Sequence, residues 1–456
     1  MNALLVSALL GVLLLFGSVF VKNRSINYFI ALVGSAVLFL LNLAELKGMQ
    51  LLNLNLEGLF YFDRYALVLN GLILFAVFCY LLLSGRSIEK LGSGFTDYLV
   101  LLFFICAGMI MVTSYSSLLI LFLGVEIISI PLYILTASDK KNLKSNEAAL
   151  KYFLLGSFST GLMLLGMALF YGARGNFAAV VSVDSTVLTS SLQLASILLL
   201  LFSMSFKVSV VPFHFWTPDV YDGAPTVFTS FMATVVKVAL FGAFIRLFED
   251  TFSMQFEKWQ PWVAVLVVLT LFIGNFTAVF QQSVKRVLAY SSIAQAGFML
   301  LAVYAINGAA KEGFLLYAIS YSLATIGIFA VLSRMSDYTF EGFNGMGKKD
   351  PITAAALTIF FLSLAGIPLT GGFLAKLFMI KAALSYATWL GIVAVLMAVV
   401  SVYYYFKVIQ SIYFKEPNES ALVAFPRTFS LLLLLIAAMI ICLGVYPEVI
   451  FGWLYF

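Results

Sequence analysis

Charged residues and catalytic side chains are scarce in this sequence. Only 10% of the 456 residues are charged, and His214 is the single histidine, so Ser/His/Asp-type catalysis is implausible. The three cysteines lie in separate apolar stretches without the spacing of a metal site, and we interpret them as small packing residues. Gly-rich phosphate loops and metal-ligand clusters are missing as well. We therefore expect no metal site and no redox cofactor in this chain.

Basic patches interleaved with aromatic residues are also missing. The net charge of +5 comes from basic residues spread over short loops, which excludes a nucleic-acid partner. Hydrophobic residues are abundant instead, at 63% of the chain. A soluble protein of this length could not bury so much apolar surface, so the lipid bilayer must be its solvent. Lys22 and Arg24 follow the first apolar run, which predicts a spanning segment there and not a cleavable signal peptide.

Long apolar runs divide the chain into about fourteen predicted spans of about 17–25 residues each. The loops between them are short, so we expect one all-α polytopic membrane domain over residues 1–456, with no soluble domain attached. The predicted limits are 2–21, 26–44, 62–84, 97–113, 117–136, 147–172, 191–213, 225–248, 262–281, 286–306, 313–335, 352–380, 386–414 and 428–454.

Basic residues predict the orientation of these spans. If the first loop faces the cytoplasm, alternate loops carry most of the lysine and arginine, whereas the opposite loops hold mostly isolated cations. This asymmetry satisfies the positive-inside rule and puts both termini outside. The clustered cations are Lys22, Arg24, Arg86, Lys90, Lys140, Lys141, Lys144, Lys285, Arg286, Arg334, Lys348, Lys349, Lys415 and Arg427.

Two predicted spans are interrupted by glycine and proline. Proline removes a backbone donor and clashes with the preceding turn, so each helix should break there. Freed backbone groups at membrane depth need protein or water partners, and paired interruptions of this kind are typical of transporters built from inverted repeats. Kinks that serve only packing are the alternative. The interrupted segments are SFKVSVVPFHFWTPDVYDGAPTVF and SLAGIPLTGGFLAKLFMIK.

Four charged residues within the predicted spans stand out because the segments around them are otherwise typical of membrane-buried helix: Glu126, Lys207, Lys237 and Lys376. A charge at the bilayer centre costs about 2.5–3.5 kcal/mol on insertion scales, so such residues should face protein or water. Desolvation favours a neutral lysine, whereas a nearby carboxylate favours the protonated form. Lysines joined by water and hydroxyl groups would therefore relay a proton stepwise. Snorkelling to the headgroups is the alternative for each lysine, and a static ion pair is the alternative for Glu126.

The helix around Lys237 has a small and polar stripe on one side. Thr226, Ser230 and Ala233 precede Lys237 at three- and four-residue spacing on an otherwise apolar helix. The stripe predicts a hydrated interior face and not contact with acyl chains.

Three further polar residues are open to two interpretations each. Glu147 begins a span after a basic loop, where it is either an accessory relay group or a solvated acid at a helix start. His214 follows Lys207 by seven residues and should project the same way, but a hydrogen-bonded loop histidine fits equally well. Gln295 either bridges waters or satisfies a neighbouring backbone group.

The chain resembles the antiporter-like proton-translocating subunits of respiratory complex I and of Mrp-type cation/proton antiporters. Four segments carry the resemblance: GVEIISIPLYIL, SFKVSVVPFHFWTPDVYDGAPT, AYSSIAQAGFM and AGIPLTGGFLAK. It covers nearly the whole chain, and PFHFWTPDVYDGAPT is highly specific. The resemblance implies about fourteen helices with two inverted five-helix repeats, helices 4–8 and 9–13, in which helices 7 and 12 are broken. The implied divisions are helices 1–3 at 1–90, the repeats at 97–250 and 260–414, and a C-terminal helix at 428–456.

The resemblance also implies roles for single residues. The family's relay groups are a helix 5 glutamate, lysines on helices 7, 8 and 12, and a second acid at the start of helix 6. Where helix 10 of the family often has histidine, this chain has Gln295, which makes water the expected carrier there. The matching relay residues are Glu126, Lys207, Lys237, Lys376 and Glu147.

Three details favour one branch of the family. Position 237 is lysine where other branches usually carry histidine, and position 376 is lysine and not glutamate. The chain also ends soon after the last predicted span, without the long lateral helix of another branch. We therefore expect the branch whose helices 8 and 12 both carry lysine.

The function implied by the resemblance is that of a proton-channel subunit of bacterial complex I in the inner (plasma) membrane. Its partners would be the lipid bilayer and other membrane subunits of the complex. NADH, FMN, iron–sulfur clusters and quinone would belong to partner subunits. Glu126 would modulate Lys207, Lys237 would pass the proton inward, and Lys376 would exchange it with the far side or a neighbouring subunit. An Mrp-type Na+/H+ antiporter subunit and a non-conducting assembly scaffold are the alternatives.

Overall fold

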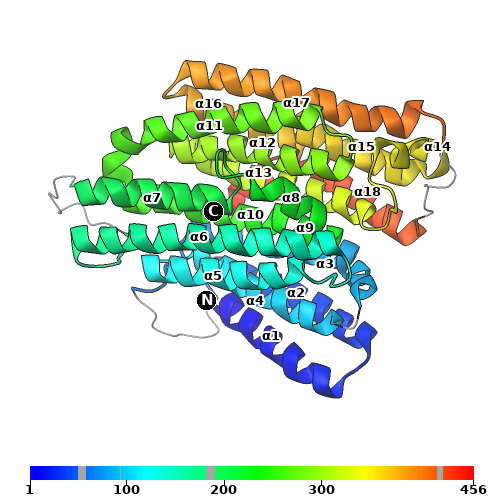
Figure 1. Cartoon of the computed structure of the whole chain (residues 1–456), viewed down its shortest axis with the longest axis horizontal. Helices are drawn as coiled ribbons and strands as arrows, with labels where there is room; N and C mark the ends of the chain where they lie inside the picture. The colour runs from blue at the N-terminus through cyan, green and yellow to red at the C-terminus, as the bar shows by residue number, and fades with distance from the viewer. Residues whose placement is uncertain (50–57, 93, 181–190, 418–424, 456) are drawn as a thin grey trace.

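Helices form most of the structure. The computed structural model describes residues 1–49, 58–92, 94–180, 191–417 and 425–455. Within these ranges the long helices run side by side in one elongated bundle (Figure 1), and β-structure is limited to isolated bridges between loops, such as Phe60 with Tyr115. The predicted all-α membrane fold is confirmed.

Six long helices make up the first part of the chain. Side chains of Asn23, Asp63 and Asn142 accept hydrogen bonds from backbone N–H groups in the first turns of the second, third and sixth helices, which fixes where these helices begin. The bounds are α1 Asn2–Phe20, α2 Arg24–Leu46, α3 Arg64–Ile88, α4 Phe95–Thr113, α5 Leu118–Thr136 and α6 Leu143–Arg174.

The second part of the chain alternates long helices with short ones. Met232–Val236 and Leu247–Thr251 are π-helical and continue α9 and α10, so that Thr226–Thr251 is one helical span. The bounds are α7 Ser191–Lys207, α8 Trp216–Gly223, α9 Thr226–Phe231, α10 Lys237–Arg246, α11 Phe256–Val279, α12 Val284–Ala305, α13 Gly308–Leu332, α14 Met346–Lys349, α15 Pro351–Ala365, α16 Gly371–Leu384, α17 Thr388–Phe414, α18 Arg427–Val445 and α19 Glu448–Tyr455.

Twelve helices in the described part of the chain are long and apolar enough to cross a membrane, so this is a multi-pass membrane protein. The count of about fourteen spans stays a prediction. The other two predicted spans, 191–213 and 352–380, correspond to the shorter helix α7 and to the pair α15 and α16. The predicted division into repeats also stays a prediction, and residue 456 of its last segment lies outside the described residues.

Both predicted breaks are present. The first lies between the end of α7 at Lys207 and the start of α8, and the second lies between α15 and α16. Gly366 ends α15 with φ 83°, a left-handed conformation that favours glycine. A Cβ at Gly372 would lie 2.0 Å from the carbonyl oxygen of Ser363, so only glycine lets the start of α16 approach the end of α15 this closely.

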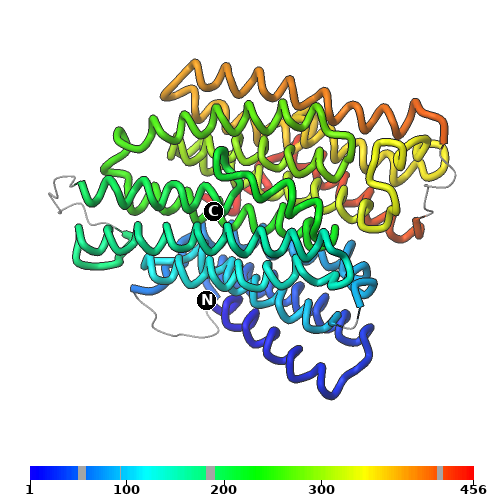
Figure 2. The backbone as a smooth tube through the Cα atoms, viewed as in Figure 1, coloured from blue at the N-terminus to red at the C-terminus, as the bar shows by residue number. Residues whose placement is uncertain are grey.

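Both chain ends lie on one face of the bundle. Met1 pairs with Glu45 near the end of α2 at 2.7 Å, and Arg64 at the start of α3 donates to the carbonyl of Trp453 in α19 at 3.0 Å. Both ends point toward the left in Figures 1 and 2, as do the α10–α11 and α16–α17 connections. We call the side that includes Met1 and Trp453 the terminal face, and the other side the opposite face.

The centre of the bundle consists of the Thr226–Thr251 span, α12 and α13, which are almost entirely buried. Helix α13 packs against α3, α15 and α16, and α12 packs against α8, α11 and α16. By contrast, α1, α2 and α17 expose much of their apolar surface. Polar groups on the central helices are therefore shielded from lipid by the surrounding helices.

Candidate functional site

Glu126 and Lys207 form a loose, bridged pair. Lys207 is the last residue of α7, where the unpaired carbonyls of a helix end favour a cation. Its Nζ lies 3.9 Å from Glu126 Oε1 and donates to the hydroxyls of Ser129 at 3.1 Å and Thr160 at 3.2 Å. Thr160 on α6 in turn donates to Glu126 at 2.8 Å. A hydroxyl thus stands between the amine and the carboxylate.

The two partners of this pair differ in exposure. The side chain of Lys207 is 5% exposed, whereas that of Glu126 on α5 is 23% exposed. Glu126 therefore lies nearer the surface of the chain than its partner does. Ser129 follows Glu126 by three residues on α5, so helical spacing places the two on one face, whereas the sequence gave no signal for Thr160, which comes from the next helix.

Lys237 lies in the fully buried centre and bonds to neutral groups. Its Nζ donates to the carbonyl oxygen of Ser292 at 2.9 Å and to the Ser292 hydroxyl at 2.5 Å. The Ser292 hydroxyl lies 3.1 Å from that of Tyr321, which donates to the carbonyl of Ala233 at 2.8 Å. The π-helical turn just before Lys237 is a feature often found at functional sites.

Lys376 is held by the second helix break. Its Nζ donates to the carbonyl oxygens of Leu364 at 2.7 Å and Ala365 at 3.1 Å. These are terminal carbonyls of α15, which lack intrahelical partners because the helix stops there. The amine also lies 4.7 Å from the centre of the Phe298 ring. The break therefore supplies the acceptors for a buried lysine.

Gln295 shares an acceptor with Lys376. Its amide nitrogen donates to the Leu364 carbonyl at 2.9 Å and to the Tyr405 hydroxyl at 2.9 Å, while Tyr317 donates to its amide oxygen. Gln295 thus satisfies a backbone group, which is one of the two interpretations that the sequence left open. It also lines a cavity next to Lys376.

This cavity, of about 10 Å³, joins the surroundings of Lys237 to Lys376. A volume of this size holds about one water molecule. The hydroxyl of Ser320 lines the cavity and is buried without a hydrogen-bond partner among the described residues. Tyr321, which bonds Ser292 beside Lys237, lines it too. The sequence analysis did not identify the residues that line this cavity. Tyr317, Ser320 and Tyr321 could have indicated it, because they form a polar group at helical spacing on the otherwise apolar helix α13.

Glu147 and His214 lie apart from the lysine row. Glu147 is 64% exposed and pairs with Lys151 at 2.8 Å, and Lys151 also bonds Asp219 of α8 at 2.8 Å. His214 lies buried in the first break with its ring against Phe215, and its Nδ1 has no hydrogen-bond partner in the described part of the chain. The structure thus brings neither residue into the bonded groups around the lysines.

A polar cavity of about 330 Å³ lies on the opposite face, where the Thr226–Thr251 span begins. Lys285 lines this cavity and is buried, whereas the sequence suggested a cation in a loop. Its Nζ donates to the carbonyl oxygens of Asp222 at 2.9 Å and Ala224 at 2.8 Å. Thr226, the first residue of the polar stripe, donates to the Tyr338 hydroxyl at 3.1 Å within the same cavity. The stripe therefore starts in a polar space large enough for several water molecules.

The chain matches a family model described as the transmembrane part of NADH:quinone oxidoreductase/Mrp antiporter subunits, over residues 116–401. The matched range contains Glu126, Lys207, Lys237 and Lys376. The chain belongs to this family. Among the described residues of this family member, no group of three or more histidine, cysteine or acidic side chains is placed to hold a metal ion.

Individual relatives agree with the family match. NADH-quinone oxidoreductase subunit N of Cytophaga hutchinsonii is 36% identical over 99% of this chain and 98% of its own length. A chain of respiratory complex I from Thermus thermophilus superposes with a TM-score of 0.86 at 30% identity, over 99% of this chain and 98% of that one. A chain of the Mrp complex from a Dietzia species has a TM-score of 0.84 at 17% identity, over 100% of this chain and 96% of that one, and so shares the fold. The resemblance predicted from the sequence is confirmed.

Proposed function

We propose that this chain is the proton-translocating membrane subunit of an NADH–quinone oxidoreductase and relays protons through Glu126, Lys207, Lys237 and Lys376. One observation carries the proposal. All three lysines are buried among membrane-spanning helices, and their amines bond to hydroxyls and backbone carbonyls, with a single carboxylate beside only one of them. Buried lysines in such surroundings exchange protons more readily than solvated ones.

Proton uptake starts at the cavity on the opposite face. Thr226 lines that cavity, Ser230 follows four residues later with a buried hydroxyl that lacks a partner among the described residues, and Lys237 follows the π-helical turn Met232–Val236 on the same span. Water bound along Ser230 would complete this path. The loops of the opposite face carry the clustered cations, so it is the cytoplasmic face of a bacterial inner membrane, and both termini lie outside.

The Glu126–Lys207 pair controls the charge next to the relay. When Glu126 approaches Lys207, the amine holds its proton; when the two move apart, the amine can release it. Thr160 bonds both groups, so it lets the pair loosen without leaving either group unpaired. Lys207 thereby acts as a switch at the end of the broken helix α7.

The second half of the relay runs from Lys237 to Lys376. The proton passes from the Lys237 amine to the hydroxyls of Ser292 and Tyr321, and then through one water in the small cavity to Lys376. Each hydroxyl both donates and accepts, which is what stepwise transfer requires. Lys376 then passes the proton to the far side or to the neighbouring subunit.

The energy for this transport comes from partner subunits. Moving one charge against 100 mV takes about 2.3 kcal/mol. The named relatives belong to NADH-quinone oxidoreductase, and a solved neighbour is a chain of respiratory complex I. We therefore assign NADH, FMN, iron–sulfur clusters and quinone to partner subunits, and this chain to a hetero-oligomeric membrane complex. The Mrp-type antiporter alternative is less well supported, because that likeness rests on 17% identity.

Tyr321→Phe tests the link between Lys237 and Lys376. The substitution removes one hydroxyl and keeps the ring, so ΔpH formation should slow at least about tenfold, equivalent to about 1.4 kcal/mol in the barrier. The measurement is ΔpH formation with NADH in inverted vesicles that contain the assembled complex. Tyr80→Phe is the matched control, because the buried Tyr80 donates to the backbone carbonyl of Val227 and, in the described part of the chain, bonds neither Ser292 nor a lysine. Equal rates in the two variants would contradict the hydroxyl link.

A further inference from the structure

The helix that carries Lys237 has two unlike halves. On the opposite-face side of Lys237 the stripe is polar, with Thr226 and Ser230. On the terminal-face side, the side of the helix that carries Lys237 consists of phenylalanine: Phe241, Phe244 and Phe248 follow Lys237 at spacings of four, three and four residues. Residues at these spacings share one side of a helix.

The phenylalanines form a continuous stack, which we call the phenylalanine ladder (Phe241, Phe244 and Phe248). All three are fully buried. Ring centres lie 6.3 Å apart between Phe241 and Phe244, and 5.3 Å apart between Phe244 and Phe248. Trp259 of α11 extends the stack, with its ring 4.8 Å from that of Phe248. Apolar space of this kind stays dry and offers no hydrogen bond to a passing proton.

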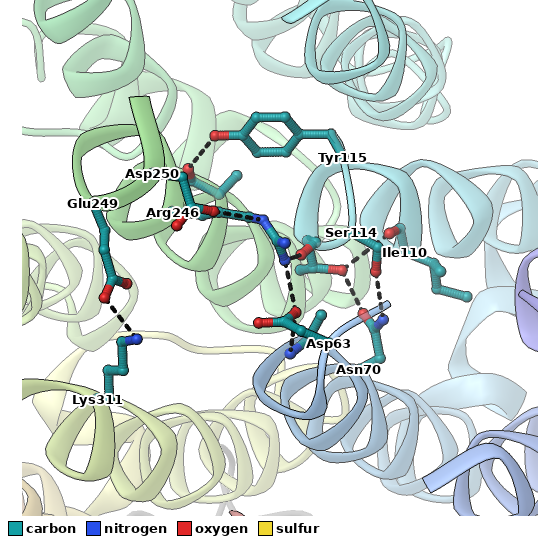
Figure 3. Close-up of polar contacts among 12 residues, drawn as sticks. Asp63, Asn70, Ile110, Ser114, Tyr115, Arg246, Glu249, Asp250 and Lys311 are labelled. Carbon is teal, nitrogen blue, oxygen red and sulfur yellow. Dashed lines mark hydrogen bonds and ion pairs between the residues drawn. The ribbon is translucent and has the colours of Figure 1, made fainter. Parts of the chain in front are cut away.

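The other side of the helix is closed by a charged cluster around Arg246 (Figure 3). Arg246 is 5% exposed, and its Nη1 donates to Asp63 at 2.9 Å and to the carbonyl of Thr113 at 3.0 Å. Its Nε lies 3.2 Å from Asp250. These contacts tie α10 to the start of α3 and the end of α4. Because arginine keeps its proton at any accessible pH, the cluster cannot relay one through Arg246.

A second ion pair beside this cluster ties the same helix end to α13. Lys311 forms an ion pair with Glu249 (Figure 3), with 2.6 Å between Nζ and Oε1, and its side chain is 33% exposed. This pair therefore lies nearer the surface than Arg246. Lys311 therefore provides a control for Arg246, because it carries the same charge and lies at the same end of the helix.

We propose that the terminal half of this helix is a proton barrier. The phenylalanine ladder prevents a proton on Lys237 from reaching the terminal face, and the contacts of Arg246 keep water out of the helix end. The inference rests on the proposed function, since it gives Lys237 a proton to retain. It adds a directing role for residues outside the relay: a proton on Lys237 can move only sideways, toward Ser292 and Lys376. The alternative is a tether that only fixes the helix end, which predicts no effect on proton leak.

The test is passive proton leak through the assembled complex in liposomes. An imposed ΔpH is allowed to decay without NADH in Phe248→Ser, Phe244→Ser and Arg246→Gln variants. Serine brings a hydroxyl into the ladder, and loss of Arg246 leaves Asp63 and Asp250 without their cation, which draws water to the helix end. We expect the leak to rise several-fold in each variant that assembles, and NADH–quinone turnover to persist with a smaller ΔpH.

Two controls distinguish the barrier from a simple tether and from general loosening of the bundle. Lys311→Gln breaks the neighbouring pair, and its leak should equal that of the unmodified complex. Adding Lys237→Met to Phe248→Ser should remove the extra leak, because the route runs through Lys237. Unchanged leak in the ladder and Arg246 variants, an equally raised leak in Lys311→Gln, or extra leak that survives Lys237→Met would overturn the proposal. Because the assay needs neither NADH nor Lys207, its outcome is independent of whether the Glu126–Lys207 switch operates.

Discussion

Replacing Lys237 by methionine is expected to stop proton pumping while the complex still assembles. Methionine matches the length and apolar stem of lysine but carries no proton, and neutral replacement of a buried charge is often tolerated or stabilising. Lys237 is 2% exposed and, among the described residues, bonds only neutral groups of Ser292, so its removal leaves none of their carboxylates without a counter-ion. ΔpH formation should fall by about two orders of magnitude, equivalent to about 2.7 kcal/mol in the barrier.

The measurement is ΔpH formation and NADH–quinone turnover in membrane vesicles, with assembly checked by the yield of intact complex. Lys381→Met is the matched control: Lys381 lies on α16 but is exposed, beside the ring of Phe378. An assembly scaffold without a conducting role predicts normal pumping in both variants. Normal pumping in Lys237→Met would therefore favour the scaffold and exclude the relay at this lysine.

Lys376→Arg is expected to abolish pumping although it keeps the positive charge. The guanidinium group can still donate to the carbonyls of Leu364 and Ala365, so these backbone acceptors at the second break should keep a hydrogen-bond donor. Arginine does not release its proton at accessible pH, so a site that must exchange one stops working. We expect a loss of ΔpH formation as large as that of Lys376→Met.

This prediction separates charge from proton exchange. If the lysine served only as a fixed cation for the orphan carbonyls of α15, Lys376→Arg would pump normally and Lys376→Met would not. Equal loss in both variants supports proton exchange at Lys376. The same vesicle assay is used, and Lys381→Arg controls for the larger side chain at a site outside the relay.

The helix breaks and the buried charges were predictable from the sequence because each depends on local chemistry. Pro212 and Gly366 interrupt spans that are otherwise apolar, and both breaks are present. Glu126 and Lys207 stand out because lipid-facing charge is costly, and the two lie 3.9 Å apart in the structure. The orphan carbonyls that hold Lys376 follow from the break beside it.

The partners of the central lysine were not predictable, since they come from distant helices. Ser292 lies 55 residues from Lys237 in the chain, and Leu364 lies 69 residues from Gln295. Which helices meet is decided by tertiary packing, to which an apolar sequence gives little clue when nearly every face is hydrophobic. Lys285 shows the same limit: it follows a loop in the sequence, but the Asp222–Ala224 turn covers it.

For Glu147, the role implied by the family resemblance and the position in the structure can be compared. The resemblance matched it to an accessory acid, and the structure gives it an exposed position paired with Lys151. Surface ion pairs of this kind contribute little stability on their own. The structure does not bring Glu147 to the lysines, so its role in the relay stays a prediction.

Lys207→Ala tests the central claim most directly. ΔpH formation and NADH–quinone turnover are measured together in vesicles that carry the assembled complex with this substitution. The relay predicts that both are lost while assembly is intact, because the Glu126–Lys207 switch must operate for each proton that is pumped and pumping is tightly coupled to electron transfer. Unchanged pumping at unchanged turnover would make Lys207 a structural charge and would contradict the relay at the pair it forms with Glu126.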